Sequence, residues 1–205
     1  MPHKVNNYYF SFIKVLFDLS FGLFIFVLIL PILLIISFTI LLTAGWPVIF
    51  IQKRMGKSGK SFMMYKFRTM YVGAHKQQTK LKGLNQAPGP MFKIFDDPRF
   101  VGIGKFISRV GLDELPQIFN ILKGEMSFVG PRPLPVAEAK ELSSAWDFRK
   151  LVRPGIFSQW TLADNRHDSL TDWKELDRKT LSQGSVTQDL ELISSTLLKS
   201  FRIRD

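Results

Sequence analysis

The chain has 205 residues, 46% of them hydrophobic, and a formal net charge of +11 at pH 7. It contains no cysteine, which excludes a disulfide framework, a cysteine-based zinc site and a cysteine nucleophile. Its length predicts one compact domain with an appendage. The excess of positive charge predicts anionic partners, which can be nucleic acid, anionic lipid or phosphorylated substrates.

The N-terminal third contains a long apolar stretch. No charged side chain occurs between Asp18 and Lys53, which is far longer than the roughly 20 residues that a membrane helix needs. Pro31 lies inside this stretch, where proline bends or breaks a helix. Basic residues flank both ends, so the positive-inside bias suits both ends on the cytoplasmic side. We therefore predict a re-entrant membrane helix broken at Pro31, with a plain tilted span as the alternative.

A β-hairpin is predicted directly after the apolar stretch. Residues 48–51 and 62–65 are β-forming runs that flank a basic, glycine-containing turn, which can lie on anionic headgroups. Lys66 and Arg68 follow the second run, and alternate residues of a strand point to the same face. Both side chains could therefore reach one ligand, although a solvated basic edge would explain them equally well.

The next segment is polar at first and then amphipathic. Residues 71–90 predict a short exposed helix followed by a loop, and an amphipathic helix ends near Arg109. The pattern Gly102-x-Gly104 is too short for a dinucleotide-binding fingerprint, and no P-loop pattern is present. Any nucleotide site must therefore have another design.

The most informative stretch is RVGLDELPQIFNILKGEMSFVGPRP, residues 109–133. Apolar residues between 115 and 122 have helical spacing, and Pro116 is tolerated only in a first helical turn. Asp113 and Glu114 are thus expected at the start of a helix that ends at Gly124. Acids at a helix start are ordinarily capping and dipole residues, which is the structural alternative to a catalytic role.

A rigid loop follows this predicted helix. Pro131, Pro133 and Pro135 fix the backbone and remove N–H donors around Arg132. An arginine on a stiff loop suits an anion site, because its guanidinium grips phosphate oxygens in pairs. The alternative is a surface arginine in a Pro-rich connector.

The motifs LDELPQ and NILKGEMSFVGPRP, together with KFRTM at residues 66–70, resemble those of the bacterial sugar transferases, the monotopic polyprenol-phosphate phosphoglycosyl transferases. The resemblance extends from about Phe17 to the C-terminus, although Leu30 replaces the serine usual before Pro31. It implies a mainly α fold with a small β-hairpin (α+β). Residues 1–46 would form a re-entrant helix hairpin, and residues 47–205 a compact cytoplasmic catalytic head with interfacial helices.

The last third departs from the family pattern. Phe157 and Ser158 replace the usual Thr-Gly, close to where specificity for the sugar or the nucleotide would be set. Arg166 matches the arginine-bearing loop of the family, which implies a contact to the nucleotide. A salt bridge to Asp164 or Asp168 explains this arginine equally well.

Two acids of this last third, Asp177 and Asp189, match acidic positions of the family. Asp189 also suits the first turn of a helix, where a negative charge is stabilising. The substrate-binding residues expected from motif and resemblance are Lys66, Arg68, Arg109, Arg132, Arg166, Asp177 and Asp189.

The resemblance implies transfer of a phospho-sugar from a UDP-sugar to a polyprenol phosphate by a ping-pong mechanism. Asp113 would attack the sugar-linked phosphate, UMP would leave, and polyprenol phosphate would attack the phospho-sugar enzyme. Glu114 would be a metal partner or the base of the second step. Asp113 and Glu114 beside a diphosphate also suit Mg²⁺, which prefers carboxylate and phosphate oxygens.

The expected location is the cytoplasmic face of the bacterial inner membrane. The expected partners are a UDP-sugar, polyprenol phosphate and the lipid bilayer, without nucleic acid, and a homo-oligomer stays open. A function from another class, a non-catalytic membrane-anchored basic module that binds anionic lipid or nucleic acid, explains the composition equally well. It does not explain two adjacent acids beside a rigid Pro-Arg-Pro loop.

Overall fold

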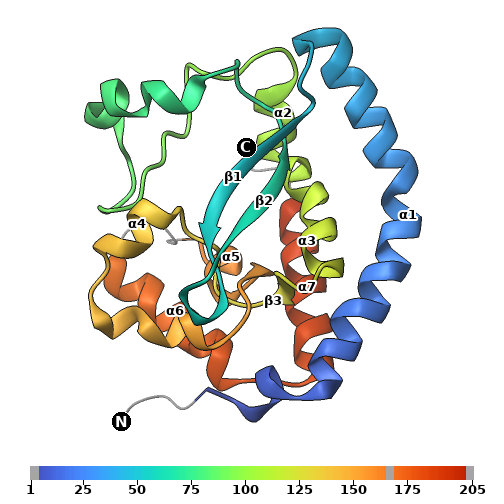
Figure 1. The fold of residues 1–205 in the computed structure, drawn as a ribbon, viewed down its shortest axis with the longest axis vertical. Coiled ribbons are helices and arrows are strands. Elements are labelled where there is room, and N and C mark those ends of the chain that lie inside the picture. The colour runs from blue at the N-terminus through green and yellow to red at the C-terminus, as the bar shows by residue number, and fades with distance from the viewer. Residues whose placement is uncertain (1–4, 165–168, 202–205) are drawn as a thin grey trace.

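The computed structural model describes residues 5–164 and 169–201. It is mostly helical, with one antiparallel and one parallel two-stranded sheet, so the predicted mainly α fold with a small hairpin is confirmed (Figure 1). The α-helices are α1 (Phe12–Ala44), α2 (Gly104–Arg109), α3 (Ile118–Leu122), α4 (Val136–Glu141), α5 (Gln159–Leu162), α6 (Leu170–Ser182) and α7 (Val186–Phe201). The strands are β1 (Ile49–Met55), β2 (Ser61–Phe67), β3 (Ser127–Val129) and β4 (Gly155–Phe157). The 3-10 helices are η1 (Asn7–Phe10), η2 (Lys57–Gly59), η3 (Ala74–Leu84), η4 (Leu112–Gln117) and η5 (Ser144–Leu151).

Helix α1 runs along a whole side of the protein (Figure 1). Its most apolar 18 residues are only 17% buried, whereas the core helix of a soluble protein is mostly buried. The helix is long and apolar enough to cross a membrane, and its exposed apolar face indicates a membrane protein. Its buried residues recur at helical spacing and form one stripe against the body, namely Lys14, Asp18, Gly22, Leu33, Ile36 and Ile40.

The predicted break at Pro31 is not confirmed, because α1 continues as one helix from Phe12 to Ala44. Pro31 is exposed, and Figure 1 shows the helix bowed with its convex side away from the body. A proline ring clashes with the carbonyl of the preceding turn, so it bends a helix away from the ring. Pro31 therefore curves α1 around the body instead of dividing it into two helices.

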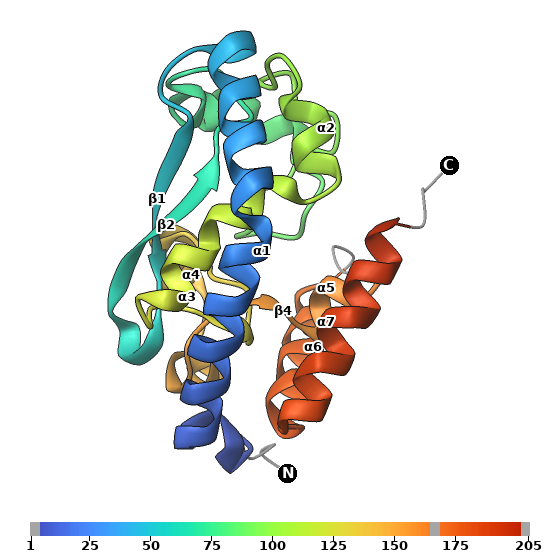
Figure 2. The ribbon, with the colours of Figure 1, turned by 90° about the vertical axis from the view of Figure 1, so that its right-hand side faces the viewer.

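Strands β1 and β2 form the predicted hairpin, with Ile49 opposite Phe67 and Met55 opposite Ser61. The hairpin returns along α1, as Figure 2 shows from the side. As a result, the ammonium group of Lys57 in the turn lies 5.9 Å from the ring centre of Phe10, which precedes α1. The segment before α1 and the turn between β1 and β2 thus meet at one end of the molecule.

The parallel pair of β3 and β4 was not predicted, because strands of three residues are too short to show an alternating pattern. Two glycines permit the close approach of their ends. A β-carbon on Gly155 would lie 2.1 Å from the backbone nitrogen of Gly130. This contact places the Pro-rich loop after β3 next to α5, which follows β4.

Buried charges anchor the start of α1. Lys14 Nζ lies 3.1 Å from Asp18 and 2.5 Å from Asp189 of α7, and Arg153 lies 3.3 Å from Asp18. The hydroxyl of Tyr8 donates to Asp189 at 2.9 Å. Buried charges are tolerated when they are paired and hydrogen-bonded, as they are here. This group of charges ties α1 to the C-terminal helix.

Arg68 holds the other end of α1. Its guanidinium donates to the carbonyls of Ala44, Gly45 (2.7 Å) and Trp46 (3.2 Å). The last carbonyls of a helix lack partners within the helix and attract positive charge. The observed partners of Arg68 are therefore these backbone carbonyls, whereas Lys66 contacts Asp113 and Glu114. That Arg68 reaches one ligand together with Lys66 stays a prediction.

Replacing Arg68 by alanine should destabilise the protein, because these carbonyls lose a charged donor. A loss of about 1.5–3 kcal/mol, the range for hydrogen bonds to a charged group, lowers the melting temperature by roughly 3–12 °C in a domain of this size. Thermal unfolding in detergent, followed by circular dichroism, measures the change. Lys53→Ala, at an exposed position of β1, is the control. An unchanged melting temperature for Arg68→Ala would refute the capping role.

Candidate active site

Four charged side chains from three distant segments meet at one place. Lys66 lies near the end of β2, Asp113 and Glu114 lie in the first turn of η4, and Arg132 lies in the loop between β3 and α4. The predicted position of both acids at a helix start is confirmed. Gly124, with a φ of 74°, follows α3, also as predicted.

Glu114 is the centre of this group. Its Oε1 accepts hydrogen bonds from Lys66 Nζ at 2.8 Å and from Arg132 Nη2 at 2.6 Å, and its Oε2 lies 3.4 Å from Arg132 Nη1. Asp113 Oδ2 lies 3.3 Å from Lys66 Nζ. The side chain of Asp113 is 10% exposed, whereas that of Arg132 is 30% exposed. The side chain of Arg132 is thus more exposed than that of Lys66, the other cation of this group.

Asn120 sets the distance between the hairpin and the acids. Its side chain is fully buried, accepts from the N–H of Tyr65 at 3.1 Å, and donates to the carbonyl of Met63 at 2.7 Å. The same amide nitrogen donates to Glu125 at 2.7 Å. A buried amide with its donors and acceptor all in use specifies one arrangement of its neighbours. Strand β2, which carries Lys66, is therefore fixed against the helical segment that follows Asp113.

The two acids of the group have opposite pKa shifts. Burial raises the pKa of Asp113, and the charge of Glu114 adds to this rise, while Lys66 offsets it only in part. Burial acts on Glu114 as well, but the charges of Arg132 and Lys66 outweigh it and hold its pKa well below the ordinary value. Glu114 is thus ionised throughout the neutral range, whereas the charge of Asp113 responds to pH.

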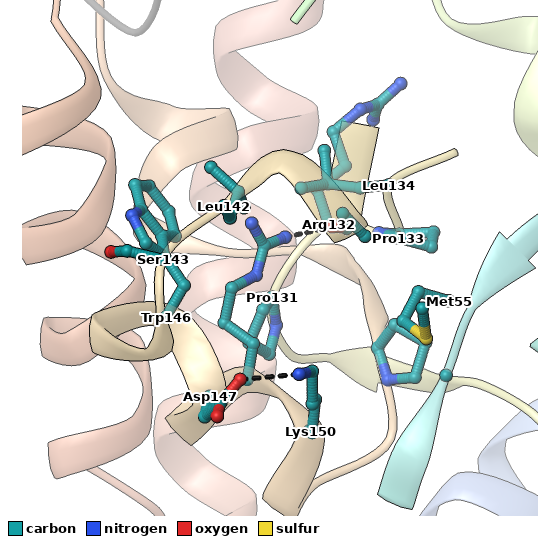
Figure 3. A pocket seen from close by; sticks show the side chains of 14 residues that line it. Met55, Pro131, Arg132, Pro133, Leu134, Leu142, Ser143, Trp146, Asp147 and Lys150 are labelled. Carbon is teal, nitrogen blue, oxygen red and sulfur yellow. Dashed lines mark hydrogen bonds and ion pairs between the residues drawn. The ribbon is translucent and has the colours of Figure 1, made fainter. Parts of the chain in front are cut away.

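The Pro-rich loop is held through its carbonyl groups. Its residues 131–134 line a small cavity of about 40 Å³, and Figure 3 shows their side chains. Prolines have no N–H, so a loop rich in proline is anchored mainly through acceptors. The carbonyls of residues 131 to 134 accept in turn from the N–H of Gly155 (3.0 Å), the guanidinium of Arg149, the guanidinium of Arg54 (3.1 Å) and the N–H of Met55 (2.9 Å).

Three tryptophans, Trp146, Trp160 and Trp173, form a cluster behind this loop. Trp160 stacks on Trp173 with ring centres 4.6 Å apart, and Trp146 meets Trp173 edge-on at 6.5 Å. The guanidinium of Arg132 lies 5.5 Å from the Trp160 ring. That of Arg149 lies 5.6 Å from Trp146 and 5.8 Å from Trp173. Both arginines are therefore stabilised by cation–π contacts with one cluster.

Asp177 and Asp189 form their contacts away from Asp113. Asp189 pairs with Lys14 at the start of α1. Asp177 is completely buried, 3.4 Å from Arg149 Nε, and burial raises its pKa to about 6 because the charge of Arg149 offsets the loss of solvent only in part. The observed partner of each acid is thus a basic side chain of the protein. Arg149, which also donates to the carbonyl of Arg132, connects Asp177 to the group around Glu114.

The remaining two predicted substrate-binding residues are arginines. Arg109 is exposed at the end of α2 and, among the described residues, forms no hydrogen bond or ion pair with the group around Glu114. Arg166 lies outside the described residues. Asp164, one alternative partner of Arg166, lies 2.6 Å from Lys199. A nucleotide contact by Arg166 stays a prediction.

Asn120 and Arg149 were missed by the sequence analysis. Asn120 stands in the apolar run IFNIL, and Arg149 stands among aromatic residues in WDFRK. A polar residue inside an apolar pattern was the available signal, since buried polar side chains need specific partners. The sequence does not identify those partners, because they come from distant segments.

Comparisons with known proteins agree with this arrangement. A family model described as bacterial sugar transferase matches residues 9–203. Galactosyl transferase CpsE of Streptococcus agalactiae is 42% identical over 156 residues, 75% of this chain and 34% of that protein. The UDP-glucose:undecaprenyl-phosphate glucose-1-phosphate transferase of Escherichia coli is 33% identical over 192 residues, 90% of this chain and 39% of that protein. The undecaprenyl-phosphate galactose phosphotransferase of Salmonella typhimurium is 35% identical over 160 residues, 74% of this chain and 33% of that protein.

The chain therefore spans little more than a third of the length of these relatives. The family match, by contrast, covers nearly the whole chain and includes the hairpin, both acids of η4 and the Pro-rich loop. On this evidence the chain belongs to the bacterial sugar transferase family.

Proposed function

We propose that this protein moves a phospho-sugar from a UDP-sugar to a polyprenol phosphate such as undecaprenyl phosphate, and releases UMP. The observation that carries the proposal is the buried carboxylate of Asp113, held 3.3 Å from Lys66 and next to the Glu114–Arg132 pair. Phosphoryl transfer depends mainly on positioning and charge stabilisation, which this group can supply. The names of two relatives include undecaprenyl phosphate, and one of them also includes UDP-glucose.

The proposed reaction has two steps, with Asp113 as the nucleophile. In the first, a carboxylate oxygen of Asp113 attacks the phosphorus that carries the sugar, the bond from this phosphorus to the bridging oxygen breaks, and UMP leaves with that oxygen. In the second, an oxygen of polyprenol phosphate attacks the same phosphorus, and the carboxylate is released. The product is a polyprenol diphosphate sugar, which would start the assembly of a polysaccharide or glycoprotein glycan.

The other three charged residues stabilise this transfer. Lys66 lies between both acids and can contact phosphate oxygens when the donor binds. Arg132, the most exposed of the group, can neutralise the leaving UMP with paired hydrogen bonds. Glu114 has a pKa held well below its ordinary value and is therefore a weak base, so we assign it to the positioning of both cations.

Mg²⁺ belongs to this proposal as a partner of the donor diphosphate. Both oxygens of Glu114 already face cations, and Asp113 uses Oδ2 toward Lys66. Asp113 Oδ1 is thus the carboxylate oxygen that fits a metal. Mg²⁺ is commonly held by one or two carboxylates together with substrate phosphates and water, so this donor set suffices. When bound, the ion would neutralise diphosphate charge and polarise the phosphoryl oxygens.

We also propose that both ends of α1 lie on the cytoplasmic side of the bacterial inner membrane. Lys14 is bound to the body at one end, Arg68 holds the other end, and the hairpin returns Lys57 to Phe10. A spanning α1 would separate these contacts or draw the charged hairpin into hydrocarbon, which is costly. An α1 that lies in one leaflet, with its exposed face toward lipid, keeps all of them.

A non-catalytic basic module is the competing function. Incubation with a panel of UDP-sugars, Mg²⁺ and undecaprenyl phosphate in detergent separates the two functions, because a binding module releases no UMP. The same panel would identify the sugar, for which the names of the relatives give different answers, galactose and glucose.

Asp113→Asn should abolish the reaction. The substitution keeps the shape of the side chain but removes the attacking charge, so we expect the rate of UMP release to fall by about 10³-fold or more. The N-cap of η4 is Gly111 and the shape at position 113 is kept, so thermal stability should change little. Activity close to that of the wild type would reduce Asp113 to a structural residue of the first turn.

The covalent intermediate gives a second measurement of the same assignment. Wild-type protein incubated with a UDP-sugar labelled in the sugar-linked phosphate, without acceptor, should carry label that hydroxylamine removes. Label that persists on Asp113→Asn would move the nucleophile to another residue, with Glu114 first. Normal turnover without any label would favour direct transfer between the two substrates.

The pH profile should report the charge of Asp113. If its carboxylate attacks, kcat/KM falls as the pH decreases through its raised pKa. Lys66→Met removes the cation that opposes this rise, so the acidic limb of the profile should move to higher pH, in addition to an overall loss of rate. Lys123→Met, at an exposed position that contacts Tyr65, is the control and should leave the limb in place. A limb that stays fixed or moves to lower pH in Lys66→Met contradicts the assignment.

The placement of α1 can be tested with single cysteines, because the chain has none of its own. Asn7→Cys and Lys57→Cys lie before and after α1, and both positions are exposed. In intact cells both should resist a membrane-impermeant thiol reagent, and both should react after the cells are permeabilised. Labelling of Asn7→Cys alone in intact cells would show that α1 spans the membrane.

A further inference from the structure

Arg149 is a buried cation that the proposed reaction does not use. It lies in η5, its side chain is 9% exposed, and it donates to the carbonyl of Arg132. Its Nε lies 3.4 Å from Asp177, which is completely buried, and its guanidinium lies against Trp146 and Trp173. A buried charge with an acid, two aromatic faces and a backbone acceptor as neighbours is held in one place.

Through its contact with the carbonyl of Arg132, Arg149 also affects the position of Arg132. The side chain of Arg132 has two neighbours of its own, the ring of Trp160 at 5.5 Å and the carboxylate of Glu114 at 2.6 Å. Arg149 and Trp160 also belong to one cluster, because Trp160 stacks on Trp173. Both the backbone and the side chain of Arg132 are therefore positioned by the same group of residues. Figure 3 shows that Arg132 and Trp146 line one pocket.

We propose that Arg149, backed by Asp177 and the tryptophan cluster, is a positioning residue that holds the Pro-rich loop so that Arg132 meets Glu114. This inference rests on the proposed function, since Arg132 is assigned there to the leaving UMP. It gives Asp177 a role behind the site, as the counter-charge of Arg149, in place of the expected contact to substrate. Arg149 itself touches neither substrate nor reacting atom.

The physical reason is the small number of anchors that a Pro-rich loop has. Without N–H groups at residues 131 and 133, the loop depends on donors to its carbonyls. Without the guanidinium of Arg149, the carbonyl of Arg132 loses its donor and the backbone there can move. The side chain of Arg132 then samples more rotamers, and ordering it again in each reaction cycle costs conformational entropy. A displacement of about 1 Å at a positioning group can lower a rate by roughly 10²-fold.

The test is a double-mutant cycle on UMP release with purified full-length protein, a UDP-sugar and undecaprenyl phosphate. Arg149→Met keeps the length of the side chain and removes its donors. We expect kcat to fall roughly 10- to 100-fold, with KM for the UDP-sugar changed by less than about 3-fold. In the Arg132→Met background, Arg149→Met should lower kcat by less than about 3-fold more, because its effect runs through Arg132. An equal loss in both backgrounds would overturn the proposal.

Arg178→Met is the matched control. Arg178 is a partly exposed arginine of α6 that also pairs with an acid, Glu175, and also lies over an aromatic ring, Phe148. Its replacement should change kcat by less than about 2-fold, as is usual for surface substitutions. A loss as large as that of Arg149→Met would mean that any arginine removed from this region impairs the protein.

Two further measurements keep the proposal testable if the first variant does not fold or if no UDP-sugar is turned over. Asp177→Asn removes the counter-charge alone, and it should again lower kcat in the wild-type but not in the Arg132→Met background. Amide hydrogen exchange of the segment 127–135 needs no substrate and should be faster in Arg149→Met and Asp177→Asn than in Arg178→Met. Unchanged exchange in these two variants would refute the positioning role, whereas faster exchange without any turnover would refute only the proposed function.

Discussion

The carboxylate of Glu114 joins three segments that are far apart in the sequence. It binds Lys66 of the hairpin and Arg132 of the Pro-rich loop from its own position in η4. Two cations that close together would repel each other without it, so the site can assemble only around an ionised acid. The same charges leave the neighbouring Asp113 with one cation at 3.3 Å and little solvent, which makes it the more readily protonated acid. One acid thus organises the site, and the other is left available for chemistry.

Much of the fold could be predicted from local sequence patterns, because tertiary contacts do not change the secondary structure that these patterns favour. The hairpin, the apolar helix and the helix start at Asp113 are each encoded within about ten to thirty neighbouring residues, which is the range over which periodicity is informative. The break at Pro31 is not confirmed, because a proline can also bend a helix without ending it, and the local sequence does not distinguish the two outcomes. The parallel pair of β3 and β4 was missed because its pairing joins residues that are not neighbours in sequence.

The charged residues of the site were predictable from the sequence, whereas the residues that hold them in place were less so. Lys66, Asp113, Glu114 and Arg132 were all expected at a phosphate site, and the structure brings these four together. Arg68, Asp177 and Asp189 were assigned to substrate from motif and resemblance, but a basic or acidic side chain serves equally well as a helix cap or a buried counter-charge. Only the partner decides between these roles, and a partner 175 residues away, as Lys14 is from Asp189, leaves no trace in a local pattern.

That separation has a consequence for the synthesis of the protein. Lys14 and Asp18 are buried charges on an otherwise apolar helix, and Asp189 leaves the ribosome 175 residues after Lys14. At about 5–20 residues per second, the lag is roughly 10–35 s. Throughout this lag Lys14 lacks its partner on α7, and its nearest acid is Asp18, one helical turn away. We therefore expect the nascent helix to stay at a polar boundary, such as the headgroup region, until Asp189 is available.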